Sequence, residues 1–126
     1  MPFYHCQKKH SFKQFNQKIG LHANHSYTYY GQWINNQKHG YGKLENHLNR
    51  SIYEGEFIEN KKHGYGRLTR QLNDGSMQRY YIGQWKNNQM NGYGTLYLNQ
   101  SAYYQGDFLD NKKSGWGRIF YENGDM

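Results

Sequence analysis

Glycines and large side chains recur at every second position in two short runs between residues 29 and 44. The first run is Tyr29, Gly31 and Trp33, and the second is Gly40, Gly42 and Leu44. A period of two is typical of a β-strand, in which alternate side chains point to one face. The pattern therefore predicts two strands that fold back on each other through the mainly polar residues 34–39.

The same pattern occurs four times along the chain. It reads Tyr-x-Gly-x-(Trp/Phe)-x₆-Gly-(Tyr/Trp)-Gly-x-(Leu/Ile) and covers residues 29–44, 53–68, 81–96 and 104–119. Successive copies start 24, 28 and 23 residues apart. Such a period is typical of a repeat array, in which each unit is stabilised by stacking on its neighbours. We expect an all-β fold, a single-layer antiparallel sheet of four tandem hairpins.

The hairpin loop at residues 34–39 sets the expected register. It pairs Trp33 with Gly40, Gly31 with Gly42 and Tyr29 with Leu44, and the other copies pair likewise. Glycine packs nothing itself, so we expect these glycines to leave room for rings that lie over the backbone. The predicted repeat core is Tyr29, Gly31, Trp33, Gly40, Gly42, Leu44, Tyr53, Gly55, Phe57, Gly64, Gly66, Leu68, Tyr81, Gly83, Trp85, Gly92, Gly94, Leu96, Tyr104, Gly106, Phe108, Gly115, Gly117 and Ile119.

The opposite face of each hairpin mixes polar and aromatic side chains. Its expected pairs are Gln32/Tyr41, Glu56/Tyr65, Gln84/Tyr93 and Asp107/Trp116. Glu54 is expected opposite Arg67, a cross-strand charge pair that contributes roughly a few tenths of a kcal/mol. One face is thus predicted to be an aromatic layer and the other to be amphipathic.

This motif resembles the MORN repeat, whose consensus is Tyr-x-Gly-x-Trp-x-(Asn/Asp)-Gly-Lys-x-His-Gly-x-Gly. The resemblance covers residues 29–119 and implies a sheet of tandem hairpins. Asparagine replaces the loop glycine in all four copies, at Asn36, Asn60, Asn88 and Asn111. Since asparagine tolerates the left-handed conformation, the turns are expected to persist. The longer linker before the third copy contains the turn sequence Asn-Asp-Gly-Ser at residues 73–76.

Positive charge is concentrated at one end of the chain. The formal net charge is +7, and residues 1–44 contain six lysines and no acidic residue, whereas residues 45–126 carry a net charge of only +1. A phosphoinositide-binding platform needs basic residues on the repeats themselves. Membrane lipid is therefore the less favoured partner. Binding of single-stranded nucleic acid by stacking is not expected, because the repeats are nearly neutral.

The segments outside the four copies supply candidate contacts. In the basic arm, residues 1–28, Ser11 is expected to cap a short helix that ends at Gly20. Its apolar stripe either covers the first edge of the sheet or docks into a partner. Residues 120–126 read as the linker of a further, truncated repeat, so the last strand is expected to expose an edge to a partner or a second copy. The candidate partner-binding residues are Phe3, Tyr4, Phe12, Phe15, Ile19, Phe120 and Tyr121.

No catalytic set, cofactor site or metal site is expected from the sequence. His5, Cys6 and His10 lack the spacing of a closed metal site, as do His22 and His25. Proteins that share the MORN resemblance include radial-spoke subunits, cytoskeletal scaffolds and membrane-bridging adaptors. The wealth of Asn, Lys, Tyr and Ile is typical of AT-rich genomes, as in many ciliated protists. We expect a non-enzymatic scaffold of the cytoskeleton, in the axoneme of a cilium. The alternative is a peripheral adaptor that binds acidic phospholipids.

Overall fold

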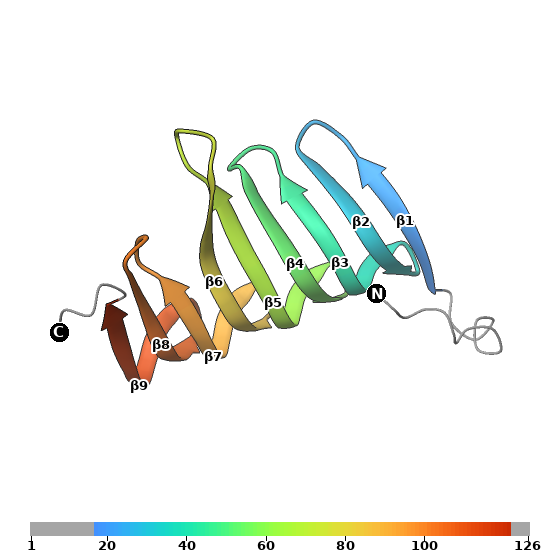
Figure 1. Cartoon of the computed structure of the whole chain (residues 1–126). Coiled ribbons are helices and arrows are strands. Elements are labelled where there is room, and N and C mark those ends of the chain that lie inside the picture. The colour runs from blue at the N-terminus through green and yellow to red at the C-terminus, as the bar shows by residue number, and fades with distance from the viewer. Residues whose placement is uncertain (1–16, 122–126) are drawn as a thin grey trace.

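A computed structural model describes residues 17–121 as one open antiparallel sheet of nine strands, each paired with its neighbours in sequence (Figure 1). No helix occurs in this part of the chain. The all-β, single-layer architecture expected from the repeats is therefore confirmed. The strands are β1 (Gln17–Ala23), β2 (Tyr27–Ile34), β3 (Gln37–Asn46), β4 (Ser51–Ile58), β5 (Lys61–Gln71), β6 (Met77–Lys86), β7 (Gln89–Tyr97), β8 (Ala102–Leu109) and β9 (Lys112–Tyr121).

The first strand was not foreseen. The expected helix from Ser11 to Gly20 is wrong for its described part, because residues 17–20 belong to β1, which pairs with β2 along its whole length. The edge of β2 needs backbone partners, and β1 supplies them. The indole Nε1 of Trp33 also donates a hydrogen bond of 3.2 Å to the Gly20 carbonyl. Residues 1–16, with the rest of the expected helix, lie outside the described residues.

A row of nine glycines crosses the whole sheet, one from each strand. Register pairs each glycine with the next. The row is Gly20, Gly31, Gly42, Gly55, Gly66, Gly83, Gly94, Gly106 and Gly117. Beside it runs a row in which tyrosine alternates with leucine or isoleucine from Tyr29 to Ile119. The predicted Gly–Gly and Tyr–Leu pairs are thus confirmed.

The predicted pairing of Trp33 with Gly40 is wrong. The hairpin closes in two residues, Asn35 and Asn36, with φ values of 52° and 66°, which is the pattern of a type I′ turn. Trp33 therefore pairs with Lys38, and a bulge follows. Gly40 adopts a φ of 90° at this bulge.

The other three hairpins repeat this correction. Phe57 pairs with Lys62, Trp85 with Met90 and Phe108 with Lys113. Each of these rings does face a glycine, but one on the preceding hairpin, in the pairs Gly40–Phe57, Gly64–Trp85 and Gly92–Phe108. Because the ring of one repeat lies against the glycine of the repeat before it, this contact joins neighbouring hairpins.

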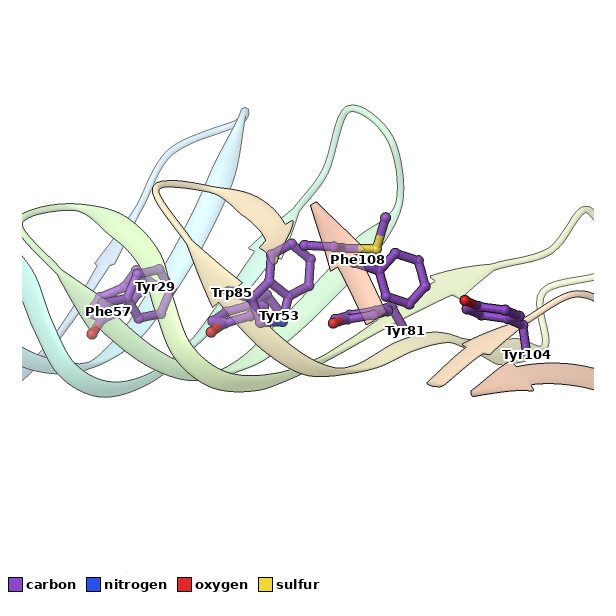
Figure 2. Packing of buried hydrophobic residues seen from close by; sticks show 8 residues of the cluster. Tyr29, Tyr53, Phe57, Tyr81, Trp85, Tyr104 and Phe108 are labelled. Atoms are coloured by element: carbon purple, nitrogen blue, oxygen red, sulfur yellow. The ribbon is translucent and has the colours of Figure 1, made fainter. Parts of the chain in front are cut away.

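The core is a continuous chain of eight rings on one face of the sheet, most of which Figure 2 shows. Each ring meets the next edge-on, with centroids 4.9–5.5 Å apart and interplanar angles of 81–90°. The order is Trp33, Tyr29, Phe57, Tyr53, Trp85, Tyr81, Phe108 and Tyr104. Each such pair contributes about 0.5–1.5 kcal/mol beyond the burial of its area. The rings therefore link all four repeats.

The core tyrosines satisfy their hydroxyl groups within the layer. Tyr29, Tyr53 and Tyr81 donate to the carbonyl three residues ahead, at 2.8–2.9 Å, which lies at the bulge of the same hairpin. Burial raises the pKa of Tyr81 to about 12 and raises the pKa values of Tyr29 and Tyr53 as well. These hydroxyls thus stay protonated and hold the bulges in place.

The turn asparagines clip each hairpin to the one before it. The backbone N of Lys62 donates to Asn88 Oδ1 at 2.9 Å, while the Asn88 backbone N donates to the Lys62 carbonyl at 3.0 Å. Asn60 and Asn111 make the same pair of bonds with Lys38 and Met90. The left-handed conformation expected for the turn asparagines is confirmed, with φ values of 66–72°. The predicted turn at residues 73–76 is confirmed as well, with Gly75 at a φ of 89°.

A substitution in the glycine row tests the packing of the rings. A Cβ at Gly94 would overlap the ring and hydroxyl of Tyr81, whereas a Cβ at Gly20 would meet only the indole of Trp33, at 3.4 Å. Since overpacking typically costs about 1–3 kcal/mol, we expect Gly94→Ala to lower the free energy of unfolding by that amount. Gly20→Ala, the matched control, is expected to change it by less than about 0.5 kcal/mol. Equal melting temperatures for the two variants in a thermal melt would contradict the packing.

The clips between hairpins are tested at one turn. Asn88→Gly keeps a residue suited to the left-handed conformation but removes the amide that accepts from Lys62. We expect it to lower the free energy of unfolding by about 0.5–1.5 kcal/mol, the usual worth of a hydrogen bond. Asn87→Gly, at the other position of the same turn (φ 50°), is expected to cost nothing. Urea unfolding measures both, and an equal loss at the two positions would mean that the clip contributes no stability.

Candidate functional site: the groove on the open face

The face opposite the core carries a row of exposed aromatic rings. Tyr41, Tyr65 and Tyr93 are 56–57% exposed, and Trp116 is 90% exposed. All four precede a glycine of the glycine row, on β3, β5, β7 and β9. On the strands between them lie Glu56, Gln84 and Asp107, which register pairs with the three tyrosines. Aromatic and polar side chains therefore alternate across the sheet.

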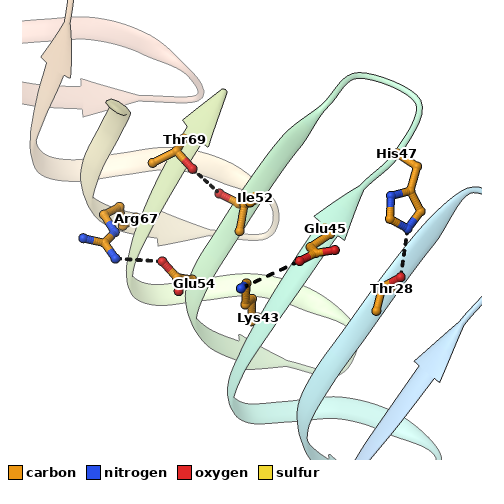
Figure 3. Close-up of polar contacts among 8 residues, drawn as sticks. All are labelled: Thr28, Lys43, Glu45, His47, Ile52, Glu54, Arg67 and Thr69. Atoms are coloured by element: carbon orange, nitrogen blue, oxygen red, sulfur yellow. Dashed lines mark hydrogen bonds and ion pairs between the residues drawn. The ribbon is translucent and has the colours of Figure 1, made fainter. Parts of the chain in front are cut away.

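A second row runs parallel to the first on the other side of the glycines. Its members on successive strands are Tyr30, Lys43, Glu54, Arg67 and Ile82. Arg67 Nη2 lies 2.7 Å from Glu54 Oε1, which confirms the predicted charge pair (Figure 3). Lys43 Nζ lies 3.7 Å from Glu45 Oε2. Each charge of this row therefore has an opposing charge, within the row or, for Lys43, two residues along the same strand.

The two rows enclose a groove with a volume of about 1040 Å³. Gly31, Gly42, Gly55 and Gly66 form its floor. Tyr41 and Tyr65 line one wall, and the second row lines the other. The groove runs across the strands from β1, where Ile19 lines it, to β6, where Ile82 does. A floor without side chains between two rows of side chains makes it a surface suited to an elongated ligand.

Glu56, like Asp107, is a carboxylate of the first row without an opposing charge. It lies between Tyr41 and Tyr65 on neighbouring strands, and no ion pair to it occurs among the described residues. The Tyr41 hydroxyl donates to Glu56 Oε2 at 3.2 Å. The negative charge of Glu56, together with this hydrogen bond, raises the pKa of Tyr41. The carboxylate thus fixes a ring and leaves a local negative potential.

The histidine and carboxylate side chains of the described residues do not gather into a metal-binding cluster. Residues 17–121 contain no cluster of three His, Cys, Asp or Glu side chains that could hold a metal ion. Of the histidines and the cysteine that lack the spacing of a closed metal site, His22 belongs to β1 and His25 to the turn that follows it, whereas His5, Cys6 and His10 lie outside the described residues.

The structure separates the expected partner-binding residues. Ile19 is 48% exposed and lines the groove. At the other end of the sheet, Phe120 stacks on Tyr103 with ring centroids 5.1 Å apart, and Tyr121 is 47% exposed on the edge strand of the described sheet. Phe3, Tyr4, Phe12 and Phe15 lie outside the described residues. The described candidates therefore belong to two different places.

Two features were missed in the sequence. The exposed tyrosines of the open face were assigned to an amphipathic face but not to a binding site. Their recurrence between the two glycines of each Gly-(Tyr/Trp)-Gly sequence is visible in the sequence. Residues 19–24 (Ile-Gly-Leu-His-Ala-Asn) also match residues 41–46 (Tyr-Gly-Lys-Leu-Glu-Asn) as half a repeat. Asn24 and Asn46 both accept bonds from the backbone two and three residues ahead. That match predicts β1.

The family model of the MORN repeat matches residues 29–45, 53–71, 81–100 and 104–126. The chain belongs to the MORN-repeat family. No curated protein matches it. MORN-repeat proteins are generally non-enzymatic repeat or scaffold proteins, and their repeats take part in protein–protein and membrane-lipid contacts.

The ionisation of Tyr41 tests the contact between Tyr41 and Glu56 on the open face of this MORN-repeat chain. Because the Glu56 carboxylate disfavours a second negative charge beside it, Glu56→Gln is expected to lower the pKa of Tyr41 toward its ordinary value. The Tyr41 ring resonance, followed by NMR as the pH is raised, reports this shift. The ring resonance of Tyr93, which register pairs with Asp107 and not with Glu56, serves as the control. An unchanged Tyr41 titration would contradict the contact with Glu56.

Proposed function

We propose that this protein is a structural scaffold whose open face binds other protein subunits in a large assembly. The observation that carries the proposal is the row of four exposed aromatic rings, two of which, Tyr41 and Tyr65, line the groove, on the face of the sheet opposite the buried core. Exposed aromatic patches commonly mark interaction sites, and Tyr and Trp are enriched where proteins bind one another. Protein partners therefore fit this face well.

Contact with acidic membranes is the second candidate, and two lysines argue against it. Lys38 Nζ lies 5.6 Å from the ring centroid of Tyr29, and Lys62 Nζ lies 5.7 and 5.6 Å from those of Tyr53 and Trp85. Burial lowers the pKa of both lysines. Since these cations cover the aromatic core, they are poorly placed to reach a phosphate group. In the described part of the chain, no helix has the length and apolar character needed to cross a membrane.

The proposed assembly is a ciliary axoneme, such as a radial spoke or another microtubule-associated complex, in the cytoskeleton of the cytoplasm or cilium. Two features support this proposal: the scaffold-like repeat architecture and the wealth of Asn, Lys, Tyr and Ile, which is typical of AT-rich genomes. Two further contacts stay predictions. One is made by the arm of residues 1–28 with a partner, and the other by the strand that carries Tyr121, with a partner or a second copy.

Two kinds of variant separate the candidates. Tyr65→Ala with Tyr93→Ala removes two exposed rings, whereas Lys61→Glu with Lys112→Glu reverses two exposed lysines that do not cover core rings. We expect the ring variant to lose most of its retention on salt-washed axonemes from a ciliated cell. The charge variant is expected to keep it. Neither protein is expected to sediment with acidic liposomes at physiological salt.

The opposite pattern would favour the membrane. Wild-type protein that sediments with liposomes and is released by the two lysine changes, while the ring variant binds normally, would contradict the proposal. Leu48→Ala, a change at an exposed residue in the connection between β3 and β4, controls for nonspecific loss. Thermal melts should show all variants folded.

A further inference from the structure

The exposed rings of the groove face recur at a regular distance. Tyr41, Tyr65, Tyr93 and Trp116 hold equivalent positions on every second strand. Neighbouring strands lie about 4.8 Å apart, so successive rings are expected about 9.6 Å apart along a line that crosses the strands. A ligand that contacts each ring in the same way must have a similar repeat.

The polyproline II helix has that repeat. It rises about 3.1 Å per residue with three residues per turn, which gives about 9.3 Å per turn. The pitch of the helix differs from the ring spacing by about 0.3 Å per turn, so the accumulated mismatch over three turns is only about 1 Å. Because this helix has no internal hydrogen bonds, it can adjust its winding to the twist of the sheet. A proline at every third residue would meet one ring per turn.

The groove floor excludes a ligand that binds as an added strand. Gly42 is paired with Gly31 on one side and Gly55 on the other, and Gly66 is paired with Gly55 and Gly83. The floor therefore offers no free strand edge, and a ligand must be held by the side chains of the walls. A polyproline II segment suits such a site, since it keeps its own backbone solvated and typically docks into aromatic-lined grooves.

Charge narrows the ligand further. Glu54 of the second row is paired with Arg67, and Lys43 is paired with Glu45, but Glu56 makes no ion pair among the described residues. Glu56 lies between the exposed rings of Tyr41 and Tyr65. A basic side chain of the ligand would find a carboxylate and two aromatic faces there, which attract a cation together.

We propose that the groove binds a proline-rich protein segment in the polyproline II conformation, with prolines at every third residue and a lysine or arginine placed to contact Glu56. The segment crosses the strands along the glycine floor. This inference rests on the proposed function, a protein-binding scaffold, and adds the class of partner that the open face recognises.

Three synthetic peptides of equal length and equal arginine content test the inference. The first has proline at every third residue, the second has proline at every fourth residue, and the third has glycine in place of each proline of the first. Fluorescence polarisation with the full chain measures their affinities. We expect the first peptide to bind at least about tenfold more tightly than the others, because only its prolines recur at the spacing of the exposed aromatic rings. Equal affinities, or no binding of the first peptide, would overturn the inference.

Variants of the protein locate the site. Tyr65→Ala is expected to weaken binding of the first peptide about tenfold, as for a truncated interface anchor, while Tyr65→Phe keeps most of it. Glu56→Gln should weaken binding of the first peptide, but it should not weaken binding of a version of that peptide in which alanine replaces arginine. Leu48→Ala should change neither. If Tyr65→Ala binds like the wild type, the groove is not the site and the inference fails.

The peptide experiment and the axoneme experiment can fail independently of each other. If no proline-rich peptide binds, but the Tyr65→Ala and Tyr93→Ala changes still release the protein from axonemes, the scaffold function stands and only the class of partner is wrong. If those changes do not affect axoneme retention, the scaffold function through this face fails, whatever the peptides show.

Discussion

The fit of a tyrosine ring over a pair of glycines is the contact on which the rest of the sheet depends. In each hairpin the tyrosine that opens the repeat lies over the second glycine of its Gly–Gly pair, so closely that a Cβ on that glycine would overlap the ring. Three of the four tyrosines are at most 1% exposed. A single sheet has no second layer to cover its core. Here the tyrosine rings lie over the glycines, the Trp and Phe rings meet them edge-on, and together they cover the core.

This arrangement makes each repeat depend on its neighbours. The ring at the Trp/Phe position lies between tyrosines of two hairpins, and the turn asparagine bonds to the preceding hairpin. Stability is therefore expected to follow nearest-neighbour contacts along the array. Because these contacts occupy one face and the turns, the other face keeps its aromatic side chains available for a partner.

The sequence was sufficient for the class of fold and for much of the register, and it failed where the chain departs from ideal strands. The Gly31–Gly42 and Tyr29–Leu44 pairs follow from alternation alone. The bulge does not, because the left-handed conformation of Gly40 cannot be seen in a pattern of alternate residues. Counting a six-residue loop in place of a two-residue turn therefore moved Trp33 from Lys38 to Gly40. β1 was missed because it carries only half of the motif.

The candidate site was harder to predict than the core. Buried positions reveal themselves by type, since only glycine and flat rings fit, whereas an exposed tyrosine such as Tyr65 fits many roles. The groove appears only when the register places the glycine floor between two rows of side chains. The sequence placed Glu56 on the correct face. It could not show that Glu56 makes no ion pair, because that depends on where Arg67 and Lys43 lie in space.

The fit of ring and glycine is tested most directly by a double-mutant cycle between Tyr81 and Gly94. The free energy of unfolding is measured for the wild type, Gly94→Ala, Tyr81→Leu and the double variant. If the ring over the glycine is the constraint, Gly94→Ala costs much less in the Tyr81→Leu background, with a coupling of about 1 kcal/mol or more. Additive effects of the two substitutions would contradict this account of the fold.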